Sequence, residues 1–284
     1  MLLVVGRDRR VRRATSVDVA RRPRGWREGV IVSGVAVFTA LVVMVPLAVI
    51  AARSLQVGGD WSTAGWHLLF SPSDVSNAVD PWRAVLASLR TSVTATVLAA
   101  AVGLALGGRG GWLRGVDALL LLPLGTSAVT VGLGMLLAFG RPPIDLRNTS
   151  ALIVLAQALV AMPFVVRVLT PALEGFDRRY LEAAAVLGRS PRQAVRSVAV
   201  PLLLPAVTVA AGFAFAVTIG EFGATVFLAT PTDPTLPVAV ARLLARPGGL
   251  TVAAAYAAST MLMVITAAVV IGLDRVRFSR AVAF

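Results

Sequence analysis

The sequence predicts an all-α polytopic membrane protein with six transmembrane helices. Hydrophobic residues make up 57% of its 284 residues and charged residues only 14%, whereas soluble domains are usually about one quarter charged. The apolar residues are gathered into six runs, and most arginines lie in the segments before and between them. The excess apolar surface has to face something other than water, and the membrane is the solvent that fits it.

Three regions are expected along the chain: a basic cytoplasmic arm at 1–29, a six-span domain at 30–275 and a cytoplasmic tail at 276–284. The arm contains nine arginines between Arg7 and Arg27. Because an apolar run follows it directly, we expect a segment attracted to anionic lipid, and no binding of nucleic acid.

The six apolar runs are the expected spans. The first, at 30–52, has about the length that a bilayer crossing requires. The second is short, so we expect residues 82–89 to extend it as an interfacial turn. Pro123 and Pro163 are expected to kink the third and fourth spans. After the first run, the others lie at 91–106, 116–139, 150–168, 200–228 and 252–273.

The arginines predict the orientation of these spans. With the N-terminus inside, 20 of the 27 arginines fall in cytoplasmic segments. Because positively charged segments are retained on the cytoplasmic side, we expect a multi-pass protein of the bacterial inner (plasma) membrane, with both termini cytoplasmic.

The composition excludes several kinds of chemistry. All 27 basic residues are arginine, so the chain has no P-loop lysine and no Schiff-base amine. It has no cysteine, and therefore no disulfide framework or thiol nucleophile. The single histidine, His67, is expected in a loop and can anchor neither a zinc site nor a hydrolytic triad. We expect no catalytic residue, no metal site and no cofactor.

The segment between the fourth and fifth spans, at about 170–200, is called the coupling segment below. Asp177 is suited to N-cap a helix that begins at Arg178, and Gly188 is suited to end it in a left-handed conformation. Leu181, Ala185 and Gly188 fall on one face of that helix. The segment therefore predicts a short helix that is followed by a glycine bend.

A second short helix is expected directly after the bend. Ser190 is a natural N-cap, Pro191 suits the first helical position, and Gln193 completes a capping box. Pro201 then allows the chain to enter the fifth span. Both short helices are expected to lie at the cytoplasmic membrane surface.

The coupling segment resembles the EAA loop of importer-type ABC permeases. That pattern is Glu-Ala-Ala, three residues, Gly, nine residues, then Ile-x-Leu-Pro. This sequence has Glu182-Ala183-Ala184, Gly188 and Val198-Ala199-Val200-Pro201 at the same spacing. Valine stands in place of both the isoleucine and the leucine, and both replacements are conservative. The resemblance implies the ABC importer (MetI-like) permease fold.

The resemblance also implies how the segment works. In that family the helix carrying Glu182, Ala183 and Ala184 docks into a groove on a separate ATPase subunit, present as a dimer. The small alanines allow a close approach, and the glutamate makes charge-assisted hydrogen bonds. Gly188 allows the bend through which ATPase closure moves the spans as rigid bodies, and Pro201 completes the set of expected coupling residues. The missing lysine agrees with ATP hydrolysis by a partner, so we expect no enzyme activity of this chain itself.

The fifth apolar run is too long for one straight crossing, and Glu221 falls near its outer boundary. Two interpretations remain open for the four residues Gly220, Glu221, Phe222 and Gly223. Glu221 is either a snorkelling carboxylate at a helix end, or part of a helix break that shapes the outer gate or pathway mouth. After this point, residues 237–245 are expected to form an amphipathic helix resting on the outer membrane surface.

Two further stretches, AQALVAMPFVVRVLTPALEGFD and GEFGATVFLATPTDPTLPVAVARLLARPG, resemble the thiamine and ferric-iron branch of these permeases. Sulfate and molybdate permeases share phrases like GEFGA. The similarity covers about residues 84–275. That branch often fuses two six-span halves, whereas this chain has one. We therefore expect a second permease copy or a paralogous permease as partner, and an extracytoplasmic solute-binding protein that delivers the solute.

The favoured function is import of a small solute, with thiamine or ferric iron expected first and sulfate or molybdate next. The alternative is an ion-gradient-driven secondary transporter. That class requires buried carboxylates near the middle of its spans, and this sequence offers almost none there.

Overall fold

The computed structural model describes residues 25–70, 81–107, 123, 125–147, 149–230 and 233–281. The expected arm before residue 25, the start of the third expected span at 116–122 and the last three residues of the tail lie outside these ranges. The chain divides into two units, Met1–Val49 and Ile50–Phe284.

Helix α1 (Trp26–Arg53) provides nearly all of the described residues of the first unit and contains the first expected span. Its 28 residues include none that is buried, and large apolar side chains such as Phe38 are exposed along it. At 1.5 Å per residue the helix is about 42 Å long, which exceeds the hydrocarbon thickness. A helix that is apolar all round at this length is suited to lipid.

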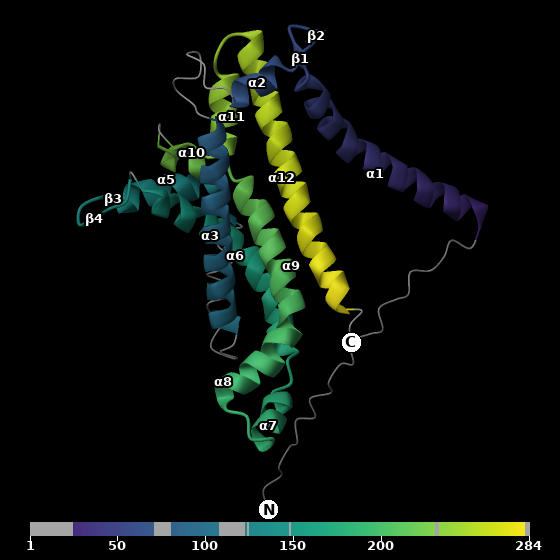
Figure 1. Cartoon of the computed structure of the whole chain (residues 1–284), viewed down its shortest axis with the longest axis vertical. Helices are drawn as coiled ribbons and strands as arrows, with labels where there is room; N and C mark the ends of the chain where they lie inside the picture. Colours follow the sequence, from purple (N-terminus) through teal and green to yellow (C-terminus); the bar gives the residue numbers. More distant parts are fainter. Residues whose placement is uncertain are drawn as a thin grey trace, which may run out of the picture. The chain divides into compact units, whose positions relative to one another are not determined.

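The described part of the second unit is mostly helical, which confirms the all-α prediction (Figure 1). Two antiparallel hairpins of two-residue strands interrupt the helices, with Gln56 opposite Trp61 in one and Gly140 opposite Asp145 in the other. The elements are β1 (Gln56–Val57), β2 (Asp60–Trp61), α2 (Ala64–Phe70), α3 (Pro81–Gly107), α5 (Ala128–Phe139), β3 (Gly140–Arg141), β4 (Ile144–Asp145), α6 (Ser150–Glu174), α7 (Arg179–Val186), α8 (Pro191–Ala194), the π turn η2 (Val195–Ala199), α9 (Val200–Ile219), α10 (Thr225–Leu228), α11 (Leu236–Leu244) and α12 (Gly249–Ala281).

Five described helices are long and apolar enough to cross a membrane: Trp26–Arg53, Pro81–Leu106, Ser150–Glu174, Pro191–Ile219 and Gly249–Leu273. They correspond to five of the six expected spans. At the position of the third, the described helix is α5, which has 12 residues and reaches only about 18 Å. Whether residues 116–122 extend it lies outside the described part of the chain, so the sixth span stays a prediction.

Two local expectations were wrong. Residues 82–89 do not form a separate interfacial turn, because α3 begins at Pro81 and runs without a break to Gly107. Proline is well suited to the first position of a helix, where its missing N–H has no intrahelical partner to lose. His67 lies in α2 rather than in a loop.

Helices α3, α6 and α9 pack against one another through small side chains (Figure 1). Fully buried alanines come from each helix, and their small size lets the helix backbones approach closely. Gly103 in α3 shows how close this is, because a Cβ there would lie 2.7 Å from Val165 Cγ1 in α6. The buried members of this cluster are Ala99, Ala161, Val165, Leu169, Ala210 and Ala214.

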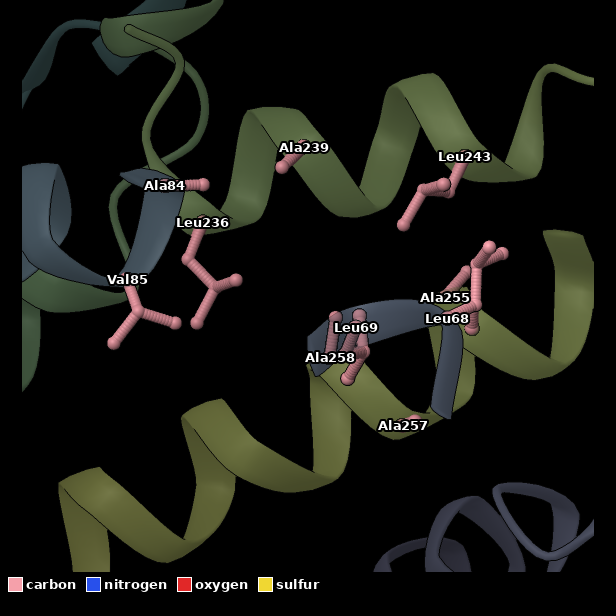
Figure 2. Packing of buried hydrophobic residues seen from close by; sticks show 11 residues of the cluster. Leu68, Leu69, Ala84, Val85, Leu236, Ala239, Leu243, Ala255, Ala257 and Ala258 are labelled. Atoms are coloured by element: carbon pink, nitrogen blue, oxygen red, sulfur yellow. The ribbon is translucent and has the colours of Figure 1, made fainter. Parts of the chain in front are cut away.

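A second cluster joins α2, α3, α11 and α12 (Figure 2). Helix α11 contributes Leu236, Ala239 and Leu243, which are at most 5% exposed, and it packs on α12 and α3. The expectation that this amphipathic helix rests on the membrane surface was therefore wrong. Its apolar face meets other helices of the same chain.

The coupling segment and α11 lie at opposite ends of the long helices of the second unit (Figure 1). Helices α7 and α8 precede α9 at one end, while α2 and α11 pack beside α12 at the other. Any effect of the coupling segment on the far end must therefore pass along the spans.

Candidate functional site

Helix α7 presents the Glu182-Ala183-Ala184 sequence on a helix with a defined start. The Asp177 carboxylate accepts a hydrogen bond from the backbone N–H of Arg179 at 2.9 Å, as an N-terminal capping side chain does. The helix begins at Arg179, one residue later than predicted. Glu182 lies in its first turn, where a negative charge is favoured by the helix dipole.

Gly188 ends α7 as predicted, with φ of +79°. The N–H of Gly188 donates to the carbonyl of Ala185 at 2.9 Å, and the N–H of Arg189 donates to that of Ala184 at 3.1 Å. This pair of hydrogen bonds is a Schellman motif, which satisfies the last carbonyls of the helix. The left-handed conformation is available to glycine without a steric penalty.

The second helix begins with the predicted capping box. Gln193 N–H donates to Ser190 Oγ at 3.4 Å, and Ser190 N–H donates to Gln193 Oε1 at 3.0 Å. Pro191 occupies the first turn. Each end of the glycine bend is thus held by its own hydrogen bonds.

The second helix is not separate from the fifth span, contrary to the prediction. Helical structure continues from Pro191 through the π turn Val195–Ala199 to Ile219. The π turn ends two residues before Pro201, which has no N–H and whose ring would clash with the carbonyl four residues earlier in an α-helix. A wider turn accommodates this residue without ending the helix, and Val200 N–H donates to the carbonyl of Val195.

Helix α7 has one packed face and one exposed face. Ala184 is its buried residue, and α7 packs on α8 and the π turn. Ala183 and Ala185 are exposed, and so are Val186 and Leu187, at 88% and 82%. Ala185 and Gly188, which were expected to share a face with Leu181, lie on the exposed side. The exposed side carries apolar surface next to the Glu182 carboxylate.

At the other end of α9, the helix breaks at the predicted place. It ends at Ile219 with Gly220 as its C-cap. The Glu221 carboxylate accepts a hydrogen bond from the N–H of Ala224 at 2.9 Å, and the Glu221 carbonyl accepts one from Thr225 Oγ1 at 2.6 Å. Both bonds hold the start of α10. Of the two interpretations of Glu221, the helix break describes the structure.

The break, formed by Gly220, Glu221, Phe222 and Gly223, packs closely on α5. A Cβ on Gly223 would lie 3.2 Å from the backbone nitrogen of Val129. A Cβ on Gly132 would overlap the backbone of Ala224. Glycine at both positions lets two backbones touch. Phe222 is 42% exposed, so it projects from this packed region.

A polar group inside the spans was missed from the sequence. Gln157 Nε2 in α6 donates to the carbonyl of Thr218 in α9 at 3.0 Å, and Thr218 Oγ1 lies 3.5 Å from the Ser92 carbonyl in α3. Three buried oxygens there have no hydrogen-bond partner: Ser92 Oγ, Thr96 Oγ1 and Gln157 Oε1. The available signal was a glutamine within an apolar run, because polar residues inside spans generally face other helices.

A family model described as the binding-protein-dependent transport system inner membrane component matches residues 99–278. The match covers more than half of the chain and includes the coupling segment and the break. The chain belongs to this family. It is therefore a multi-pass membrane permease component, and the predicted family is confirmed.

Two relatives of this permease are named for different solutes. The molybdenum transport system permease protein ModB of Mycobacterium tuberculosis is 33% identical over 249 residues, which cover 81% of this chain and 88% of that protein. The putative 2-aminoethylphosphonate transport system permease protein PhnV of Salmonella paratyphi A is 31% identical over 242 residues, with the same two coverages. The predicted thiamine and ferric-iron branch is named by neither, and it stays a prediction.

Solved structures show the same permease fold. A bacterial ABC transporter involved in the import of the acidic polysaccharide alginate matches with a TM-score of 0.64 at 15% identity, over 89% of this chain and 96% of that one. The alginate transporter in complex with its alginate pentasaccharide-bound periplasmic protein matches with a TM-score of 0.62 at 16% identity, over 88% and 93%. At such identities the likeness establishes the ABC importer permease fold.

The permease also has two arginines on α3, Arg83 and Arg90, that were not predicted as site residues. They line a cavity of about 600 Å³ together with residues from α6 and from the segment before α11. In the sequence they counted only as two of the arginines expected outside. Their spacing of seven residues, two helical turns, was the signal that places them on one face.

Proposed function

We propose that the chain is the membrane-spanning subunit of an ATP-binding-cassette importer and forms the translocation path for a small solute. One observation carries the proposal. A capped helix that exposes Glu182 beside apolar side chains is joined, through Gly188 and one continuous helix, to a break at Gly220–Gly223. This arrangement suits the transmission of movement from a docked partner to the far end of the bundle.

The first step is docking of a separate ATPase on α7. The exposed surface offers small and apolar side chains at Ala183, Val186 and Leu187, with Glu182 supplying a charge for an arginine or a backbone N–H of the partner. Contiguous apolar surface of this kind is typical of protein interfaces. The absence of any lysine supports hydrolysis by that partner, because a P-loop requires one.

The second step is transmission along the helix that runs from Pro191 to Ile219. Its 29 residues span about 43 Å, and it packs on α6 and α3 through the alanine cluster. Because packed helices move as rigid bodies, displacement of the coupling segment reaches the break. Glu221 and its neighbours Gly220, Phe222 and Gly223 then act as part of the outer gate.

The orientation follows from this reading. The coupling segment has to face the cytoplasm, where the ATPase dimer is, and both termini are then cytoplasmic. The arginine distribution supports the same orientation. The region containing α2, α11 and the break faces outward, toward a solute-binding protein, and a second permease subunit completes the path.

An oxyanion is the proposed solute. The relatives carry the names of molybdenum and 2-aminoethylphosphonate systems, and molybdate was among the solutes expected from the sequence together with sulfate. Thiamine and ferric iron, the first expectations, have no support from these relatives. An ion-driven secondary transporter is disfavoured, because α3 and α9 contain no acidic residue and Glu174 stands at the last position of α6.

The test is reconstitution of the permease with the ATPase and the solute-binding protein of the same importer. We expect molybdate uptake into proteoliposomes that requires ATP on the ATPase side and is insensitive to a proton ionophore. Uptake that persists without the ATPase and stops with the ionophore would support the secondary transporter. Replacing molybdate by sulfate, 2-aminoethylphosphonate, thiamine or ferric iron in the same assay identifies the solute.

A further inference from the structure

The cavity beside α3 differs in chemistry from the rest of the spans. It measures about 600 Å³, enough for roughly twenty water molecules at ~30 Å³ each. Its lining from α3 includes Arg83, Ala87, Arg90 and Thr91. We call this cavity the vestibule.

The vestibule lies at the end of the spans that is remote from the coupling segment. Ser88, which lies between the lining residues Arg83 and Arg90 in α3, accepts a hydrogen bond from the N–H of Leu236 at 2.6 Å, and Leu236 begins α11. Helix α11 is at the end opposite to α7 and α8 (Figure 1). The first half of α3 and the vestibule are therefore at that same end.

Two guanidinium groups enter the vestibule from one helix face. Arg83 has a further interaction within the chain. Anion binding is therefore expected to depend mainly on Arg90. The Arg90 side chain is exposed and makes no ion pair with a carboxylate of the described residues. A guanidinium presents several N–H donors in a planar fork, which matches the oxygens of a tetrahedral oxyanion.

The start of α6 adds backbone donors to the lining of the vestibule. Thr149 and Ser150 line the vestibule, and Ser150 is the first residue of α6. The N-cap residue Thr149 makes no side-chain capping bond, because its hydroxyl donates to the carbonyl of Leu146 at 2.8 Å. The first N–H groups of this 25-residue helix therefore have no side-chain cap, and helix N-termini favour anions.

We propose that the vestibule is a transit site for tetrahedral oxyanions within the permease itself, with Arg90 as the principal ligand and Arg83 and the start of α6 as its support. This proposal rests on the function proposed above and adds the place where the solute enters the membrane subunit. The size of the vestibule lets the anion keep part of its hydration shell. Binding should therefore be weak, as transit requires.

The carboxylate of Asp233 is expected to weaken the binding of an anion in the vestibule. Asp233 also lines the vestibule, and its backbone N–H donates to Thr230 Oγ1 at 3.2 Å. A carboxylate in the lining offsets part of the positive charge of Arg83 and Arg90. Removing that carboxylate should therefore strengthen the attraction for an anion, whereas removing the arginines should weaken it.

The chain has no cysteine, so a single introduced thiol reports on the vestibule. Ala87→Cys places the thiol in the lining, and Gln56→Cys, at a similarly half-buried position in the β1–β2 hairpin, is the matched control. The full chain in nanodiscs is labelled with an anionic reagent, 2-sulfonatoethyl methanethiosulfonate, and with a cationic one, 2-(trimethylammonium)ethyl methanethiosulfonate. The ratio of the two rates is compared between positions.

We expect the ratio of the anionic to the cationic labelling rate to be about tenfold higher at Ala87→Cys than at Gln56→Cys. A charged cleft produces such a difference by electrostatic focusing. Arg90→Gln should reduce that preference several-fold, Arg83→Gln less, and Asp233→Asn should increase it. Molybdate at millimolar concentration should slow labelling at Ala87→Cys in the parent and in Asp233→Asn. In Arg90→Gln it should not.

Equal ratios at the two positions, or a preference that survives both arginine replacements, would overturn the proposal. Protection by sodium chloride as strong as that by molybdate would also overturn it, since screening alone then explains the effect. No labelling at Ala87→Cys by either reagent would show that the vestibule is closed, and this result would also overturn the proposal. The labelling requires neither ATP nor an ATPase. A failed uptake assay with a positive labelling result therefore counts against the proposed importer function and leaves the oxyanion site in place.

Discussion

Replacing Gly188 tests whether the bend between α7 and α8 transmits movement. The φ of +79° lies in the left-handed region, and no atom lies within 4 Å of a Cβ built there. The cost of Gly188→Val therefore comes from the backbone alone, on the order of 1–3 kcal/mol for a β-branched residue. At 1.4 kcal/mol per factor of ten, the equilibrium constant in favour of the Schellman motif falls by about five- to more than a hundredfold.

The assay is ATP-dependent molybdate uptake in proteoliposomes, measured with co-purification of the ATPase. Gly188→Val should abolish most of the uptake while membrane insertion is retained. Gly188→Asn is the conservative variant, because asparagine tolerates the left-handed region, and it should keep most of the uptake. Gly272→Val in α12 is the matched control, since Gly272 also has open space around it but no positive φ. Normal uptake and ATPase stimulation in Gly188→Val would refute the idea that this bend matters for coupling.

Four other outcomes are expected. Glu182→Lys should reduce co-purification of the ATPase strongly, because loss of an interfacial charge pair is worth about 2–5 kcal/mol; unchanged assembly in a pull-down would show that the carboxylate has no partner. The purified chain should release no phosphate from ATP in a coupled assay, and hydrolysis without a partner would contradict its role. A reporter fused after Ala281 should be cytoplasmic, and an external reporter would reverse the whole orientation. Gly132→Val should disturb the packing of α5 on Ala224 and lower the thermal midpoint of the purified protein by several degrees, whereas Gly134→Val, with open space around it, should change it little.

The sequence predicted those features that depend on neighbouring residues. The capping box at Ser190 and the left-handed Gly188 require only side chains within one or two turns, so their patterns determine the local structure. The break at Gly220 is similar, because the run was too long for one crossing. Even there, the hydrogen bond from the N–H of Ala224 to Glu221 was not expected.

Features that depend on distant packing were missed. Amphipathicity in α11 indicates an apolar face but does not say whether that face meets lipid or α12, and the structure has the latter. Pro201 was expected to mark the entry into the fifth span after a second short helix, whereas in the structure that helix continues into the span through a single wide turn. Arg83 and Arg90 belong to different turns of α3, and only the position of α6 beside them produces the vestibule.

The π turn between Val195 and Ala199 has a consequence for the rotational phase of the two ends. A π turn holds about one residue more than an α-helical turn, and one residue corresponds to about 100° around a helix axis. Residues before the turn and residues after it are therefore out of step by roughly that angle, compared with an uninterrupted helix. Deleting one residue within 195–199 would remove the offset and swing Arg192 and α7 to another side of the bundle. The direction in which Glu182 faces a partner thus depends on the length of a five-residue turn as well as on the identity of the residues in α7.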